Sequence, residues 1–112
     1  MQATNSSNGK LVAARVVRAE TAKTRVIGLM GRRSMEPGEA LWIVPCSNIH
    51  TFFMRFPIDV LFLDEQLSVL RVIDRLRPWR VSPWVWKAHS VLELEGGALN
   101  GAVKPGDRLE FR

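Results

Sequence analysis

The sequence predicts a mainly β protein of the α+β class. We expect six or seven strands in a small antiparallel barrel or strongly curled sheet, with one N-terminal helix packed against it. Three observations lead to this prediction. Short runs of β-branched and aromatic residues are separated by turns that contain Gly or Pro. One segment repeats its apolar residues at helical spacing. The run IDVLFL (58–63) is apolar on both faces, as a covered central strand is.

The chain starts with a polar stretch, residues 1–9, which we expect to be disordered. Residues 10–112 are then expected to form a single domain, because a chain of 112 residues with 46% apolar and 24% charged residues can bury one core without disulfide or metal staples. The β-branched run KLVAARVVRA (10–19) predicts the first strand.

One helix is expected over residues 21–31. Thr21 is a suitable N-cap and Gly31 suits the position just after the helix. Gly28, inside this segment, costs about 1 kcal/mol relative to Ala in a helix interior. We therefore expect a close backbone contact at Gly28.

The rest of the chain predicts strands and turns. Residues 51–56 are expected to be extended, because Pro57 disfavours a helical conformation at Phe56. In the run SVLELE, Leu92 and Leu94 lie on one face of a strand, and Val91, Glu93 and Glu95 lie on the other. The other expected strands are 41–44, 58–63 with its hairpin partner 67–76, 90–95 and 108–112.

The cellular compartment is predicted from the apolar runs, the first residues and the cysteine content. Its apolar runs are far shorter than the ~20 residues of a membrane-spanning helix. The polar first residues do not resemble the apolar core of a secretory signal. The single cysteine allows no internal disulfide. We expect a cytoplasmic protein, or an extracytoplasmic one if a signal has been removed.

The net charge of +5 is concentrated in RLRPWRVSPWVWK, residues 75–87, here called the Arg/Trp segment. It contains four cations, no acid and three of the four tryptophans. The favoured interpretation is a long loop whose tryptophans cover the core. Two weaker alternatives are a surface for single-stranded nucleic acid and, less favoured still, contact with an anionic membrane.

Several motifs occur in an order that resembles a known family. They are RVIGLMGR (25–32), HTFFMRFPIDVLFLD (50–64), VLELEGG (91–97) and KPGD (104–107). In this order they resemble the uncharacterised bacterial and archaeal family DUF 192, also called UPF 0127, over about residues 20–112. The resemblance implies a compact, mostly β fold and no established activity. The chain departs from the family at FFMRF, where many members have a Trp-Met-Lys-Asn-Thr run.

A polar cleft is predicted just before the central strand. We expect a binding module in which His50, Thr51 and Arg55 donate or accept hydrogen bonds. Its ligand would be a small anionic or sugar-like molecule, or a peptide segment of a partner. The predicted binding residues are His50, Thr51, Met54, Arg55, Asp59, Trp79, Arg80, Trp84 and Trp86.

Asp59 lies near the start of the apolar run 58–63, where an unpaired carboxylate is costly to bury. We expect it to pair with Arg25, Arg32 or Arg55 and so to tie the helix to the sheet. The alternative is an enzyme, a small hydrolase or lyase in which His50 acts as general base and Asp59 orients it. Non-enzymatic binding is the favoured hypothesis.

Cys46 and His50 lie four positions apart and are suitable zinc ligands. The chain has one further histidine, His89, so a complete site would need a carboxylate. Cys46 could also act as a nucleophile with His50 as its base. A lone cysteine is more often a small buried hydrophobe, and the sequence therefore predicts neither a metal nor another cofactor.

Overall fold

The structure, a computed structural model, describes the backbone of residues 1–112 and every side chain except that of Val26. It contains eight strands and one short helix. In chain order these are β1 (Ala3–Asn5), β2 (Leu11–Ala13), β3 (Arg15–Ala19), α1 (Ala22–Ile27), β4 (Glu39–Ile43), β5 (Ile58–Leu63), β6 (Val69–Leu76), β7 (Ser90–Glu95) and β8 (Leu109–Phe111).

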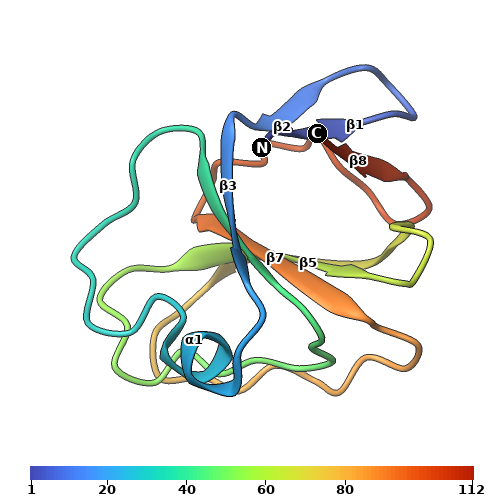
Figure 1. Cartoon of the computed structure of the whole chain (residues 1–112). Coiled ribbons are helices and arrows are strands. Elements are labelled where there is room, and N and C mark those ends of the chain that lie inside the picture. Colours follow the sequence, from blue (N-terminus) through green and yellow to red (C-terminus); the bar gives the residue numbers. More distant parts are fainter.

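The strands form two sheets. One has the order β2-β1-β8 and the other has the order β3-β4-β7-β5-β6, in which only the β3–β4 pair is parallel. Figure 1 shows the three-stranded sheet on one side of the five-stranded sheet and α1 on the other. The prediction of a mainly β fold with one helix is confirmed. These pairings give two sheets, so a single closed barrel or strongly curled sheet stays a prediction.

The central strand is β5, hydrogen-bonded to β7 on one side and β6 on the other. All six of its side chains are buried, which confirms that the run is covered on both faces. Its side chains divide between two cores, as a two-residue period requires. Leu61 and Leu63 join Leu92 and Leu94 of β7 in the core beneath the three-stranded sheet. The other core, on the helix side, contains Ile58, Val60, Phe62, Val91, Leu29, Met35, Ile49, Met54 and Phe56.

Helix α1 is shorter than expected. Thr21 is its N-cap, as predicted, and exchanges hydrogen bonds with Thr24 in a capping box. The helix ends at Gly28, whose φ of 45° lies outside the right-handed helical region, so the expected end at Gly31 is wrong. Gly28 therefore terminates the helix, and Gly31 belongs to the turn that follows.

Residues 1–9, expected to be disordered, instead include strand β1. Strand β1 lies between β2 and β8, and Ala3 and Asn5 are fully buried. The Asn5 side chain donates to the Ala102 carbonyl (3.0 Å) and to Asp107 Oδ2 (2.8 Å). Polar residues near a terminus are ordered here because their partners lie about a hundred residues away, which local composition does not reveal.

Two other segments also differ from their predictions. Residues 10–19 form two strands in different sheets, β2 and β3, rather than one strand. Residues 51–56 form a turn rather than an extended strand, with Phe53 at a φ of 64°. The turn buries Thr51 and Met54 and exposes Phe53, so side chains here do not alternate between two faces.

Asp59 has no arginine partner of the kind we expected. Its Oδ1 accepts hydrogen bonds from the backbone N–H groups of Arg75 (2.9 Å) and Gly97 (3.0 Å), and Oδ2 accepts from Leu99 N–H (3.0 Å). The predicted ion pair is therefore wrong, because three backbone donors stabilise the buried carboxylate without a cation. Arg32 instead pairs with Glu39 (2.9 Å). Asp59 thus ties β5 to the end of β6 and to the turn that follows β7.

We expect Asp59→Asn to lower the free energy of unfolding by about 2–3 kcal/mol. The amide NH₂ of Asn would face the Leu99 N–H, leaving two donors opposed and one buried hydrogen bond lost. Urea denaturation measures the change. The control is Asp74→Asn, an exposed aspartate on the neighbouring strand β6, which should stay within about 0.5 kcal/mol of the parent. An equally small effect for both variants would contradict this role for Asp59.

Candidate functional site

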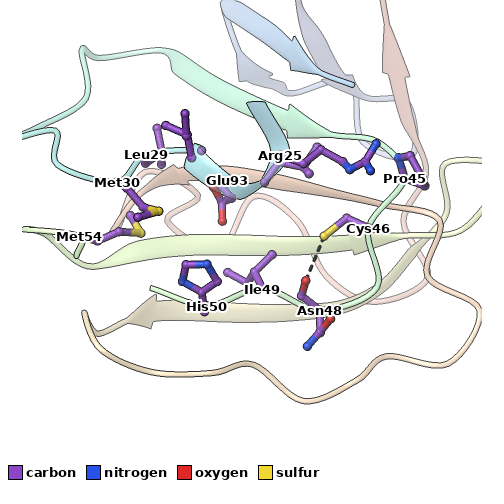
Figure 2. A pocket seen from close by; sticks show the side chains of 13 residues that line it. Arg25, Leu29, Met30, Pro45, Cys46, Asn48, Ile49, His50, Met54 and Glu93 are labelled. Atoms are coloured by element: carbon purple, nitrogen blue, oxygen red, sulfur yellow. Dashed lines mark hydrogen bonds between the residues drawn. The ribbon is translucent and has the colours of Figure 1, made fainter. Parts of the chain in front are cut away.

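A cavity of about 170 Å³ lies on the helix side of the five-stranded sheet. Its lining comes from the end of α1 and the turn after it, from the end of β4 and the segment 45–54, and from β7. Figure 2 shows these side chains from close by. The cavity therefore gathers residues from three regions of the chain that are far apart in sequence.

Glu93 of β7 provides the acidic group of the cavity. It is only 3% exposed, and its neighbours across the sheet are Leu41 on β4 and Val60 on β5. Burial among these apolar side chains raises the pKa of Glu93 to about 8. The carboxyl is therefore mostly protonated and neutral near pH 7.

The Glu93 carboxyl points into the cavity in Figure 2. Among the residues that the structure describes, it has no hydrogen-bond or ion-pair partner. Gly28, at the end of α1, leaves room beside it, since a Cβ added there would lie 3.8 Å from Glu93 Oε1. The carboxyl is thus buried, unpartnered and next to an open space.

His50, Cys46 and two methionines line the same cavity. His50 Nδ1 accepts the Phe52 N–H (3.2 Å), so a neutral imidazole carries its proton on Nε2. The Cys46 thiol donates to the Asn48 carbonyl (3.0 Å), and burial raises its pKa to about 11. A thiol that stays protonated near neutral pH is a weak nucleophile and a poor metal ligand. No group of three or more His, Cys, Asp or Glu side chains that could hold a metal ion is found in the described part of the chain.

Of the nine predicted binding residues, the structure brings two into this cavity, His50 and Met54, together with Cys46, a candidate metal ligand. Thr51 is fully buried elsewhere, where its hydroxyl donates to the Arg77 carbonyl (2.6 Å) and accepts from Arg80 N–H (2.8 Å). It holds the Arg/Trp segment against residues 47–51. Arg55 is exposed.

Asp59 lies on the opposite face of the sheet from the cavity. Its neighbours Ile58 and Val60 face the helix-side core, so Asp59 points toward the three-stranded sheet. Both of its carboxylate oxygens accept hydrogen bonds from backbone N–H groups on that side of the sheet. The proposed pairing of Asp59 with His50 as a catalytic base is therefore contradicted by the geometry.

The tryptophans of the Arg/Trp segment do not cover the core, and that interpretation is wrong. Trp79, Trp84 and Trp86 are 55%, 70% and 77% exposed, and Arg80 is exposed as well. Val85 and Ala88 pack on the helix-side core in their place. The backbone of this segment is hydrogen-bonded to residues 47–51, and Ser82, Val85 and the adjoining Ala88 are more buried than the three tryptophans, so the large rings are left outside.

Trp79 packs against two other exposed rings. Its ring centroid lies 5.9 Å from that of Phe52 and 4.8 Å from that of Phe53. The segment and the adjoining turn therefore present aromatic rings beside several cations on the protein surface.

Sequence reasoning missed Glu93, Arg25 and Met30 as lining residues of the cavity. A signal for Glu93 was present, because alternation placed it on one face of a strand whose other face carries Leu92 and Leu94. That the Glu93 face is also covered depends on where α1 and segment 45–54 fold, and local sequence does not specify this.

The fold and the cavity define a compact, mainly β domain of two sheets with a small acidic pocket under its helix. The chain belongs to the DUF192 (UPF0127) family, whose model, described as "Uncharacterized ACR", matches residues 3–111. This confirms the resemblance. The family has no assigned function. Within residues 1–112, no helix is long and apolar enough to cross a membrane.

Individual relatives agree with this assignment. A UPF0127 protein of Pyrococcus horikoshii is 35% identical in an alignment that covers 83% of this chain and 84% of the relative. One of Pyrococcus abyssi is 38% identical in an alignment that covers 78% of this chain and 77% of the relative. The crystal structure of a protein of unknown function from Novosphingobium aromaticivorans is 23% identical with a TM-score of 0.84, over 98% of this chain and 82% of that one. It has the same fold.

Glu93 should make stability depend on pH. The folded pKa of about 8 lies above the ordinary value of 4.5, so between these values the unfolded chain releases a proton that the folded chain keeps. The contribution of Glu93 to the free energy of unfolding therefore falls as pH rises through this window, by at most about 1.4 kcal/mol per pH unit. Above about pH 8, where both states are deprotonated, the Glu93 contribution to the free energy of unfolding no longer changes with pH.

Urea denaturation across this pH range measures the effect against Glu93→Gln, which cannot ionise. The other ionisable groups that line the cavity, Arg25, Cys46 and His50, are unchanged in that variant. Relative to it, the parent protein should lose stability from pH 5 to 8. Glu95→Gln, at an exposed position of the same strand, should keep the parent profile. Parallel curves for the parent and Glu93→Gln would contradict a buried, neutral Glu93.

Proposed function

We propose that this protein is a non-enzymatic binding module that takes a small ligand with a polar group into the cavity around Glu93. The observation that carries the proposal is an almost fully buried carboxyl that faces this cavity and has no partner among the described residues. An unsatisfied buried polar group costs about 1–3 kcal/mol. A ligand that donates a hydrogen bond or a charge to Glu93 would remove this cost.

The size and lining of the cavity support a ligand of few atoms. An engineered apolar cavity of about 150 Å³ holds benzene, and this one, at about 170 Å³, is of similar size. Leucine, isoleucine and methionine side chains contribute six of the thirteen lining residues, and the polar lining residues are Arg25, Cys46, Asn48, His50 and Glu93. Apolar walls that carry a small number of placed polar groups are typical of small-molecule sites.

Binding is favoured over catalysis by the state of the reactive groups. The Cys46 thiol is protonated near neutral pH, and His50 has no orienting carboxylate since Asp59 is engaged elsewhere. Of the cleft predicted from the sequence, the proposal keeps His50 and Met54. It replaces Thr51 and Arg55 with Glu93 as the main polar contact.

A test compares the parent protein with Glu93→Leu. The variant exchanges an unpartnered buried carboxyl for an apolar side chain of similar size, so it should be more stable near pH 7 and should lose ligand binding. Ligand-observed NMR with a library of small polar fragments measures binding, and thermal unfolding measures stability. Glu95→Gln is the control and should bind like the parent. Undiminished fragment binding by Glu93→Leu would refute the proposal.

A second candidate function is favoured by the exposed rings of the Arg/Trp segment. Trp84 and Trp86 are the most exposed large hydrophobic residues of the described structure. Neither ring stacks on another aromatic ring there. Free ring faces beside Arg77, Arg80 and Lys87 could stack on the bases of a single-stranded nucleic acid while the cations contact its phosphates.

This second function predicts that a fluorescent oligothymidylate binds with an affinity that falls steeply as salt rises. Removing both rings in Trp84→Ala/Trp86→Ala should weaken binding at least about tenfold, since each stacked base contributes roughly 1–3 kcal/mol. Val17→Ala, at an exposed apolar residue of β3, is the control. Retention on anionic lipid vesicles but not on the oligonucleotide would favour a membrane surface instead and would rule this function out.

A further inference from the structure

The cavity around Glu93 has a basic residue as well as an acidic one. Arg25, on the last turn of α1, lines it together with Glu93. The two do not pair with each other. The ion pairs within the described residues are Arg18–Glu20, Arg32–Glu39 and Arg112–Glu110. A cationic guanidinium and a neutral carboxyl that can ionise thus line one cavity without an ion pair between them.

Both groups have unused hydrogen-bonding capacity. One guanidinium nitrogen of Arg25 donates to the Glu20 carbonyl (2.6 Å), which leaves most of its five N–H groups available. Arg25 is half-buried, and Glu93 lies deeper in the sheet. An ammonium group near Glu93 would favour the ionised carboxylate, because an opposite charge at close range lowers the pKa of an acid.

The cavity also has apolar lining residues. Leu29, Ile43 and Ile49 line the cavity, with the thioethers of Met30 and Met54. Figure 2 shows Arg25 on the helix side and the two methionines on the other side of Glu93. A short aliphatic group fits this lining, and a longer chain exceeds the volume of about 170 Å³.

We infer that the ligand is a small zwitterion of the α-amino-acid type. Its ammonium group contacts Glu93, its carboxylate faces Arg25, and its short aliphatic side chain lies against Leu29, Ile49 and the methionines. This inference rests on the proposed function and names the ligand class for the same cavity.

A ligand with only one of the two charges matches the cavity less well. An amine satisfies Glu93 but brings a second cation near Arg25. A carboxylate pairs with Arg25 but leaves Glu93 without a cation. The zwitterion supplies both partners in one molecule of few atoms, so its affinity should exceed that of either half.

Three matched probes test this on the parent protein by isothermal titration calorimetry at pH 7. They are L-valine, isobutylamine (valine without its carboxylate) and isovalerate (valine without its ammonium group). L-Valine should bind at least about tenfold more tightly than either of the others. Titration in two buffers of different ionisation enthalpy should show release of close to one proton per valine bound, as Glu93 ionises.

Two variants test which side chain binds each charged group of the ligand. Glu93→Gln should reduce the affinity for valine to that for isovalerate. Arg25→Gln should reduce it to that for isobutylamine. Lys23→Gln, at an exposed cation of the same helix, should leave both preferences unchanged. The comparison of the three probes on the parent protein stands even if a variant fails to fold.

The outcomes separate the two proposals. If polar fragments bind in a Glu93-dependent manner but valine binds no better than its two halves, the zwitterion inference is overturned and the binding module stands. If neither fragments nor valine bind, both are overturned. Tight valine binding that survives Glu93→Gln and Arg25→Gln would place its site elsewhere and overturn the inference.

Discussion

The fold depends on one constraint, which is that two neighbouring inner strands of the five-stranded sheet, β7 and β5, are covered on both faces. Strands β5 and β7 bury eleven of their twelve side chains. One face packs under the three-stranded sheet and the other under α1 and segment 45–54. A polar side chain on either strand must therefore find a partner inside the protein or remain unsatisfied.

The two buried acids of these strands meet this constraint in opposite ways. Asp59 faces the three-stranded sheet, and three backbone N–H groups stabilise its carboxylate. Glu93 faces the helix side, where its flanking residues are apolar and burial raises its pKa to about 8. The hydrogen bonds of Asp59 stabilise the fold. The burial of Glu93 without a partner lowers stability. The cavity beside Glu93 gives a physical reason for keeping this residue, since a bound ligand would supply the missing partner.

The covered faces also explain why the Arg/Trp segment is so exposed. Its backbone pairs with residues 47–51, and Val85 and Ala88 complete the helix-side core from that position. The large rings are left outside beside the cations. The surface they form is separate from the cavity, so each can be tested without the other.

The sequence by itself determined the β class, the hairpin of β5 with β6 and the N-cap of α1, because these depend on periodicity and on residues close together in the chain. Tertiary structure alone decided the roles of the two acids. Alternation assigned Glu93 to a face of its strand, but the burial of that face depends on residues 21–54. Likewise, the amides that hold Asp59 come from strand β6 and from the turn after β7, up to forty positions away. Burial and hydrogen-bond partners of this kind are set by long-range packing, which no local pattern encodes.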